Sequence, residues 1–311
     1  MDMFDGKNIK PMLIGEMQEA FDSPDYIYEL KLDGERCIAY LDKNSTDLRN
    51  KRNIKMLAKV PELSNIHKQV KCRCILDGEL IVTKDGKPDF FEIQRRSLMS
   101  NSFKIQLAAS KLPATFTAFD ILYYDDHEVI ELPLLQRKNL LQKVIKENDR
   151  ISISRYIEEQ GINFYNIAKE NQLEGIVAKR KDGRYYLDKR TKEWIKMKNL
   201  QDDDFVICGY IFKDSGVISI VLGQYSGSEL VYKGHVTLGM STPNFKIIKS
   251  TTVLSIQPFN NLPSGNDNAV WIELKLVCTV KYMMKTTNDS MRQPVFKGLR
   301  DDKEPKECII K

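Results

Sequence analysis

The chain has 311 residues, of which 42% are hydrophobic and 29% are charged. This balance excludes a disordered chain, a collagen and a coiled-coil rod, and a prior of about 150 residues per domain predicts two domains. Its 48 lysines and arginines against 43 aspartates and glutamates give a net charge of +5, which permits a nucleic-acid partner without requiring one.

The cysteine pattern and the apolar runs indicate a cellular compartment. Six cysteines are spread through apolar runs and none forms a C-x-x-C pair, which is typical of a reduced intracellular protein without a structural zinc site. Residues 1–10 lack the apolar core of a signal peptide, and no apolar run approaches the ~18 residues of a membrane span. We therefore expect a soluble, cytoplasmic protein with no membrane partner.

Residues 1–200 are predicted to alternate short strands with helices. Runs rich in β-branched and aromatic residues at 26–32 and 36–41 flank Asp33-Gly34, the dipeptide most typical of a β-hairpin. Further strands are predicted over 74–82, 115–124, 174–179 and 193–198. Apolar residues at helical spacing predict helices over 134–145 and 161–172.

A polar, acidic stretch at 199–204 interrupts this pattern, and we place a linker and the domain boundary there, between domains 1–200 and 201–311. Only strand-like runs punctuated by turn residues follow it. They are predicted over 205–212, 217–224, 230–237 and 270–282. Several short strands of this kind predict a small β-barrel.

The segment Glu29-Leu30-Lys31-Leu32-Asp33-Gly34-Glu35-Arg36 places a lysine at the end of a predicted strand, just before a turn and an arginine. Taken alone, such a lysine is as often an ordinary solvated hairpin residue. Further segments that contain charged residues follow in a fixed order, at 49–51, 76–80, 116–122, 174–179 and 194–199.

The order and spacing of these segments resemble the covalent nucleotidyltransferase superfamily: ATP-dependent DNA ligases, RNA ligases and mRNA capping enzymes. Residues 292–303, and 234–236 with Gly239, resemble the ligase domain of bacterial ligase D, an end-joining enzyme. The resemblance implies an α+β adenylation (nucleotidyltransferase) domain with antiparallel sheets, followed by a β-barrel OB-fold domain. It also implies an ATP-dependent DNA ligase that seals nicks or breaks between 5′-phosphate and 3′-hydroxyl ends.

The family's nucleophile matches Lys31, which must attack the α-phosphorus of ATP as a neutral amine. A free lysine has a pKa of about 10.4, and nearby cations and desolvation favour the neutral form. Arg36, Lys196, Lys198 and a bound metal are the candidate cations. Lys196 and Lys198 lie two residues apart on a predicted strand, so both face the side that Trp194 faces. The resemblance assigns both lysines to the α-phosphate.

The resemblance assigns further ATP-site roles. Glu29 matches the adenine-specificity position, and Phe119 the ring stacked on adenine. Glu79 contacts the ribose and, with Glu174, holds Mg²⁺ or Mn²⁺, which prefer carboxylate and phosphate oxygens. Two plainer alternatives stay open: Phe119 as a core residue, and Glu29, Glu79 and Glu174 as ordinary strand charges.

Two arginines, Arg36 and Arg49, match positions that contact the nucleotide and the 5′-phosphate of the nicked strand. Arginine suits phosphate because its guanidinium donates two parallel hydrogen bonds. The family usually has Ser or Thr before the second arginine, whereas this sequence has Leu48, and Arg52 is a nearby competitor.

At the C-terminal end, Arg300, Asp302 and Lys303 match residues that orient the pyrophosphate when the OB domain closes over ATP. We place the hinge for that closure at 199–204. The basic stretch 179–198, with interleaved aromatic residues, predicts a DNA-backbone contact.

The implied partners are nicked double-stranded DNA and a Ku-type end-binding protein. The chain is expected to act as a monomer, in repair or replication, near the nucleoid of a bacterium or in a virus of one. Three alternatives stay open: an RNA ligase, a GMP-charging capping enzyme, and a non-catalytic nucleic-acid-binding protein with the same fold.

Overall fold

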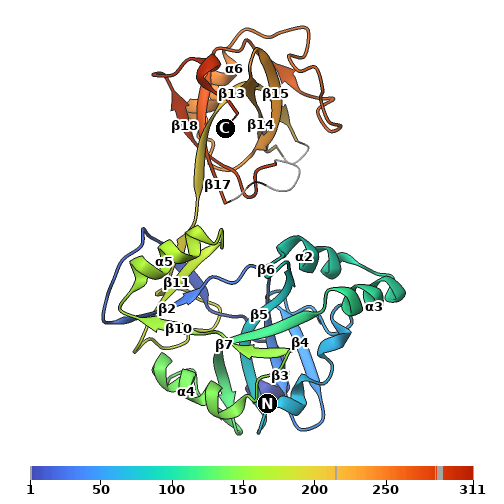
Figure 1. Ribbon diagram of the computed structural model, residues 1–311, viewed down its shortest axis with the longest axis vertical. Helices are drawn as coiled ribbons and strands as arrows, with labels where there is room; N and C mark the ends of the chain where they lie inside the picture. Colours follow the sequence, from blue (N-terminus) through green and yellow to red (C-terminus); the bar gives the residue numbers. More distant parts are fainter. Residues whose placement is uncertain (1, 214–215, 284, 286–289, 311) are drawn as a thin grey trace. The chain divides into compact units, whose positions relative to one another are not determined.

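The computed structural model describes residues 2–213, 216–283, 285 and 290–310 (Figure 1). Helices and largely antiparallel sheets alternate along them, which confirms the predicted α+β class. The chain divides into two compact units, the first ending at Asn199 and the second beginning at Leu200. In the described ranges, no helix has the length and apolar character that crossing a membrane requires.

Two sheets form the frame of the first unit. The five-stranded sheet has the order β1-β12-β11-β2-β10, with β1 parallel to β12. Its strands are β1 (Leu13–Met17), β2 (Tyr26–Leu30), β10 (Tyr156–Glu158), β11 (Gly175–Arg180) and β12 (Arg190–Lys198). The seven-stranded sheet has the order β4-β3-β5-β7-β8, with β6 beside β5 and β9 beside β7. Its strands are β3 (Glu35–Leu41), β4 (Thr46–Asn50), β5 (Cys74–Lys84), β6 (Lys87–Pro88), β7 (Ala114–Tyr124), β8 (His127–Glu128) and β9 (Ile151–Ile153).

Helices cover the outer faces of these sheets. Helix α5 (Gly161–Glu170) contacts β11 and β2, and α4 (Leu134–Val144) contacts β7 (Figure 1). The sequence predicts both helices, but it misses α2 (Phe90–Leu98) and α3 (Ser102–Lys111). Their N-caps are Asp89 and Asn101, whose side chains accept backbone N–H bonds, so the missed signal is a capping residue. The shorter helices are α1 (Met3–Gly6), η1 (Pro61–Leu63) and η2 (Ile66–Gln69).

Alternation along the strands decides which side chains face the space between the two sheets. On β11, Ile176 and Ala178 pack in one cluster with Ala168 of α5, whereas Val177 packs in another with Ile38 of β3. Successive residues of a strand point to opposite faces, so every second side chain of β2, β11 and β12 enters the inter-sheet space.

The predicted hairpin at Asp33-Gly34 is wrong. Strand β2 pairs with β10 and β11, whereas β3 pairs with β4 and β5 in the other sheet. Neither residue of the dipeptide has the positive φ of a type I′ turn. Gly34 serves a close approach instead, because a Cβ there would lie 2.1 Å from the carbonyl oxygen of Leu80. The segment after Lys31 is therefore a crossover between the sheets.

The second unit has an antiparallel sheet in the order β15-β14-β13-β17-β18, with β16 beside β13. Its elements are β13 (Gln201–Phe212), β14 (Ile218–Ser226), β15 (Glu229–Val236), α6 (Thr242–Lys249), β16 (Val270–Trp271), β17 (Val277–Tyr282), β18 (Val295–Arg300) and η3 (Pro305–Glu307). The strand predicted over 270–282 is interrupted, and α6 and β18 are not predicted. A bridge between Leu238 and Val295 brings the chain beyond β15 to β18, so the outer strands of the sheet approach each other.

The predicted linker over 199–204 is mostly strand. Only Asn199 and Leu200 separate β12 from β13, and residues 201–204 pair with β17. The hydroxyl of Thr279 on β17 donates to Asp204 at 2.6 Å. The acidic composition of 199–204 suggested a solvated linker. The partners of Asp204 lie far along the chain, so the local sequence does not show that this carboxylate is paired.

Candidate active site

A pocket of about 320 Å³ opens in the first unit, between the strands of the two sheets. It brings together residues that the sequence analysis predicted as ATP-binding: Glu29, Lys31, Arg36, Glu79, Phe119, Lys196 and Lys198. Four further charged or aromatic residues in the lining were not predicted to bind ATP: Lys51, Lys179, Arg190 and Trp194. Basic side chains outnumber carboxylates in this lining, so the pocket suits a polyanion.

Lys31 directly follows β2, and its ammonium group meets a carboxylate at the start of β11. Its Nζ donates to Glu174 Oε2 at 2.8 Å, and Lys198 Nζ lies 3.2 Å from Oε1 of the same side chain. The Lys31 amide donates to the carbonyl of Gly175 at 2.9 Å. Gly175 has a φ of 130°, and a Cβ there would lie 2.0 Å from the Met197 carbonyl oxygen, so the position requires glycine. One carboxylate thereby positions two amines.

Burial shifts two titrations in the pocket towards the uncharged forms. Burial, followed by the ammonium groups of Lys198 and Lys31, lowers the pKa of Lys196. Burial raises the pKa of Glu79 to about 8, against the opposing effect of Lys31 and Arg36. Both shifts disfavour the charged form, and a bound phosphate at Lys196 or a cation at Glu79 would oppose them.

Arg36 on β3 is fixed by a buried carboxylate that the sequence analysis did not single out. Its Nε and Nη2 donate to the two oxygens of Asp77, at 3.0 and 2.6 Å. The Tyr185 hydroxyl donates to the same carboxylate at 2.6 Å and accepts from the Met12 amide at 3.0 Å. Asp77 precedes Glu79 by two residues on one strand, so side-chain alternation could have revealed it.

Phe119 and Trp194 form an aromatic wall, with ring centroids 5.8 Å apart and planes at 87°. The Nζ of Lys179 lies 4.4 Å from each ring centroid, within cation–π range. Lys179 also donates to Glu29 Oε2 at 3.1 Å, and Lys138 of α4 pairs with the other oxygen. Burial lowers the pKa of Lys179 to about 8, against the effect of Glu29. Lys138 falls at the apolar spacing of its helix, a signal that the sequence analysis did not use.

Arg49 lies outside the pocket lining, unlike the other predicted ATP contacts on the first unit's strands. It pairs with Asp47 at 3.1 Å and donates to Asn53 at 3.3 Å. Lys51, two residues further on, does line the pocket. The basic group nearest the pocket in this segment is therefore a lysine that the sequence analysis did not select.

Arg300, Asp302 and Lys303 lie in the second unit and contact one another through carboxylates. Arg300 donates two hydrogen bonds of 2.7 Å to Asp302, and Lys303 Nζ donates to Asp204 Oδ2 at 2.7 Å. Arg300 Nη1 also lies 3.3 Å from both Asp204 oxygens. Although burial opposes it, Lys303 and Thr279 hold the pKa of Asp204 below its usual value. Asp204 was predicted only as part of a linker.

Glu79 and Glu174 are the candidate oxygen donors for a divalent cation. Within the described residues, no cluster of three or more histidine, cysteine, aspartate or glutamate side chains could hold a metal. Two carboxylates fit a cation whose remaining ligands are phosphate oxygens and water, which is how Mg²⁺ is commonly held. The raised pKa of Glu79 also fits, because a cation would displace the proton that its burial retains.

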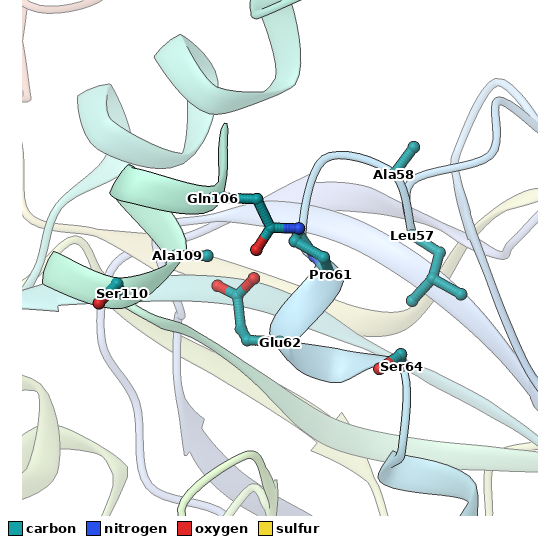
Figure 2. A pocket seen from close by; sticks show the side chains of 8 residues that line it. All are labelled: Leu57, Ala58, Pro61, Glu62, Ser64, Gln106, Ala109 and Ser110. Atoms are coloured by element: carbon teal, nitrogen blue, oxygen red, sulfur yellow. The ribbon is translucent and has the colours of Figure 1, made fainter. Parts of the chain in front are cut away.

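A second cavity, of about 700 Å³, lies between η1 and α3 (Figure 2). Small and apolar side chains form most of its lining, and Glu62 is the one charged side chain there. Glu62 Oε1 accepts from the Ala114 amide at 2.7 Å and pairs with buried Arg96. This carboxylate already has structural partners, so we place the active site in the smaller pocket.

Comparisons with known proteins match both units. A family model described as "ATP dependent DNA ligase domain" matches residues 11–198, and one described as "ATP dependent DNA ligase C terminal region" matches residues 213–303. The chain is 29% identical over 293 residues to the SPbeta prophage-derived DNA ligase-like protein LigB of Bacillus subtilis (strain 168). That match covers 94% of this chain and 99% of the Bacillus protein.

The chain is also similar to longer proteins and to solved structures. It is 26% identical over 319 residues to the multifunctional non-homologous end joining DNA repair protein LigD of Mycobacterium tuberculosis, covering 99% of this chain but 40% of that protein. The crystal structure of the ligase domain from M. tuberculosis LigD superposes with a TM-score of 0.55 at 24% identity, over 98% of this chain and 99% of that one. A Lig E DNA ligase structure gives 0.63 at 18% identity, over 94% and 100%. These structural matches support the fold.

Proposed function

Because the chain belongs to the ATP-dependent DNA ligase family, we propose that Lys31 is the nucleophile that accepts the adenylyl group. The Nζ lone pair attacks the α-phosphorus of ATP, a P–N bond forms, and the bond to the pyrophosphate oxygen breaks. One observation carries this assignment: Glu174 holds the Lys31 amine beside Lys198, next to a pocket lined with basic side chains.

The basic side chains have separate tasks in this step. Lys196 and Lys198 bind the α-phosphate and stabilise the negative charge that develops on its oxygens. Arg36 contacts the nucleotide with a guanidinium that Asp77 orients in advance.

The aromatic wall and the buried carboxylate beside it bind the base. Phe119 presents a ring face for stacking on adenine. Glu29 lines the same pocket and is a hydrogen-bond acceptor for the adenine amino group. Lys179 and Lys138 each contact one oxygen of Glu29. Binding of the adenine amino group to Glu29 therefore replaces one of these two ionic contacts with a hydrogen bond.

We assign Mg²⁺, or Mn²⁺ in its place, to Glu79 and Glu174. When bound, the cation neutralises phosphate charge. Glu79, which lines the pocket, also contacts the ribose in this proposal. The amine of Lys31 must leave Glu174 before it reaches phosphorus.

The second and third steps act on DNA. The adenylyl group moves from Lys31 to the 5′-phosphate of a nick, and the 3′-hydroxyl then attacks that phosphate and releases AMP. Arg49, with Lys51 and Arg52 close to it in the sequence, is the candidate contact for the 5′-phosphate. Nicked double-stranded DNA is thus the proposed substrate.

We propose that the second unit is an OB-fold, so that an adenylation domain over 1–200 precedes an OB domain over 201–311. The approach of its outer strands through the Leu238–Val295 bridge supports a closed barrel. Arg300, Asp302 and Lys303 orient the pyrophosphate during the first step. The sequence analysis placed the hinge at 199–204; because 201–204 belong to β13, we place the movement at Asn199 and Leu200, which would bring these residues to ATP.

The biological setting follows from the relatives' names. LigD is named for non-homologous end joining, and the Bacillus relative is prophage-derived. We therefore propose repair by end joining, or replication, in the nucleoid of a bacterium or of a cell that its virus infects. The chain works as a monomer, with a Ku-type end-binding protein as its partner at breaks.

Intact-mass spectrometry tests the proposed chemistry. The protein is incubated with Mg²⁺ and ATP, GTP or NAD, and an AMP adduct is expected from ATP alone. Lys31→Ala should give no adduct, whereas Lys192→Ala, an exposed lysine on β12, should give a normal one. A GMP adduct would indicate a capping enzyme, and no adduct from protein shown to be free of bound AMP would indicate a non-catalytic binding protein. Sealing nicked RNA in preference to nicked DNA would indicate an RNA ligase.

A further inference from the structure

One carboxylate of the second unit holds both cationic side chains that we assign to pyrophosphate. Asp204 accepts from Lys303 at 2.7 Å, from Arg300 at 3.3 Å and from Thr279 at 2.6 Å. Its side chain is 15% exposed, so solvent weakens these contacts only in part. Asp302 binds Arg300 from another side, but it is part of the same terminal segment and moves with it.

From this geometry, we propose that Asp204 is an intramolecular competitor for pyrophosphate, which holds Arg300 and Lys303 until ATP displaces it. The inference rests on the proposed function, because it needs Arg300 and Lys303 to bind the leaving group. A carboxylate and a pyrophosphate oxygen make the same kind of charge-assisted hydrogen bond to these donors. A donor of Lys303 that points at Asp204 is not available to pyrophosphate, so each of the two anions weakens the binding of the other.

The competition between Asp204 and pyrophosphate predicts in which direction the reaction rates change when Asp204 is altered. In this proposal, self-adenylylation replaces the Lys303–Asp204 contact. The cost of breaking that contact adds to the barrier of the first step and of its reversal by pyrophosphate. The last step, attack of the 3′-hydroxyl on DNA-adenylate, involves no pyrophosphate and is not affected. Removing the negative charge should therefore accelerate one step of the reaction and leave another unchanged.

The variant Asp204→Asn tests this with little change in shape. The amide oxygen of the substituted side chain still accepts from Thr279, while the ion pairs with Lys303 and Arg300 are lost. Asp202→Asn is the matched control, because it removes the same charge from the same face of β13, two residues away. In the described ranges, Asp202 has no ion pair within 4.0 Å.

We expect Asp204→Asn to raise kcat/KM for ATP in single-turnover formation of enzyme-AMP about fivefold, which corresponds to about 1 kcal/mol. Asp202→Asn should stay within about twofold of the parent protein, and sealing of a nick that already carries a 5′-adenylate should be equal in all three. An Asp204→Asn rate equal to or below the parent rate would overturn the inference. No adduct in the parent protein would instead refute the nucleotidyltransferase assignment, and the inference with it.

A measurement on the unaltered protein covers the case in which Asp204→Asn does not fold. Hydrogen bonding to Asp204 raises the pKa of Lys303, whereas Lys306 is exposed three residues away. Limited acetylation followed by peptide mass spectrometry should modify Lys303 more slowly than Lys306, because acylation requires a free neutral amine. Equal rates would show that Asp204 does not hold Lys303 in solution.

Discussion

The contact between Arg36 and Asp77 gives a prediction in which stability and ATP binding change by different amounts. Asp77 is fully buried and accepts two hydrogen bonds from Arg36 and one from Tyr185. Removing one partner of a buried ion pair costs about 3–5 kcal/mol. Asp77→Asn keeps the shape and one acceptor, and Arg36 retains some solvent contact. We therefore expect a loss of about 2–3 kcal/mol in the free energy of unfolding.

The same substitution should weaken ATP binding, because Arg36 loses its orientation between the rings of Phe119 and Trp194. We expect the KM for ATP in enzyme-AMP formation to rise about tenfold, or about 1.4 kcal/mol. Tyr185→Phe is the control, because it leaves both hydrogen bonds that Arg36 donates to Asp77. It removes the hydroxyl that donates to Asp77 and accepts from the Met12 amide and, at 3.4 Å, from Arg36 Nη2. Stability should therefore fall by about 1–3 kcal/mol with little change in KM. Urea denaturation and ATP-dependent single-turnover kinetics measure the two effects. An unchanged KM in a destabilised Asp77→Asn protein would refute the idea that Arg36 is preorganised for the nucleotide.

Two further predictions concern the pocket before and during ATP binding. Burial raises the pKa of Glu79 to about 8 in the folded protein, from an ordinary value of 4.5, so deprotonation favours the unfolded chain. Without ATP and metal, the parent protein should therefore lose stability relative to Glu79→Gln as the pH rises from about 5 to 8. Above that range, the difference in stability between the two proteins should stay constant. Thermal unfolding at each pH measures this difference, and parallel stability curves over the whole range would contradict the raised pKa. ATP should change the fluorescence of Trp194, which lines the pocket. A Trp271→Phe protein should keep this change, whereas a Trp194→Phe protein should lose it. A fluorescence change that is lost in Trp271→Phe instead would place the nucleotide elsewhere.

Local pattern was sufficient for most of the first unit. Apolar spacing gave α4 and α5 within two residues of their ends, and β-rich runs gave β5 and β7. Local pattern failed after Lys31, where the chain crosses from one sheet to the other. Asp33-Gly34 has the composition of a hairpin, but the partner of each flanking strand is decided by packing with residues far along the chain. A dipeptide cannot carry that information.

The candidate site shows the same limit. Lys31, Arg36 and Lys196 could be selected because motifs and alternation place them, and both kinds of signal are local. Asp77, Lys138 and Asp204 were not selected, because each matters through a contact with a residue distant in sequence. Their sequence signal is only a charge at a position that should be buried or paired. Reading charged residues on apolar faces as ion-pair partners would have found the first two.

The pocket gathers positive charge that is unfavourable in the absence of a ligand. Seven basic side chains and two carboxylates line it, and repulsion between the basic groups opposes folding in the absence of ligand. Lys196 responds with a lowered pKa, Lys31 and Lys198 share Glu174, and Lys179 shares Glu29. A nucleotide can replace each of these ion pairs: a phosphate can take the place of Glu174 at Lys31 and Lys198, and the edge of a base can take the place of a lysine at Glu29. If the proposed site is correct, these ion pairs neutralise the pocket only until ATP binds, and the same reasoning extends to Asp204 in the second unit.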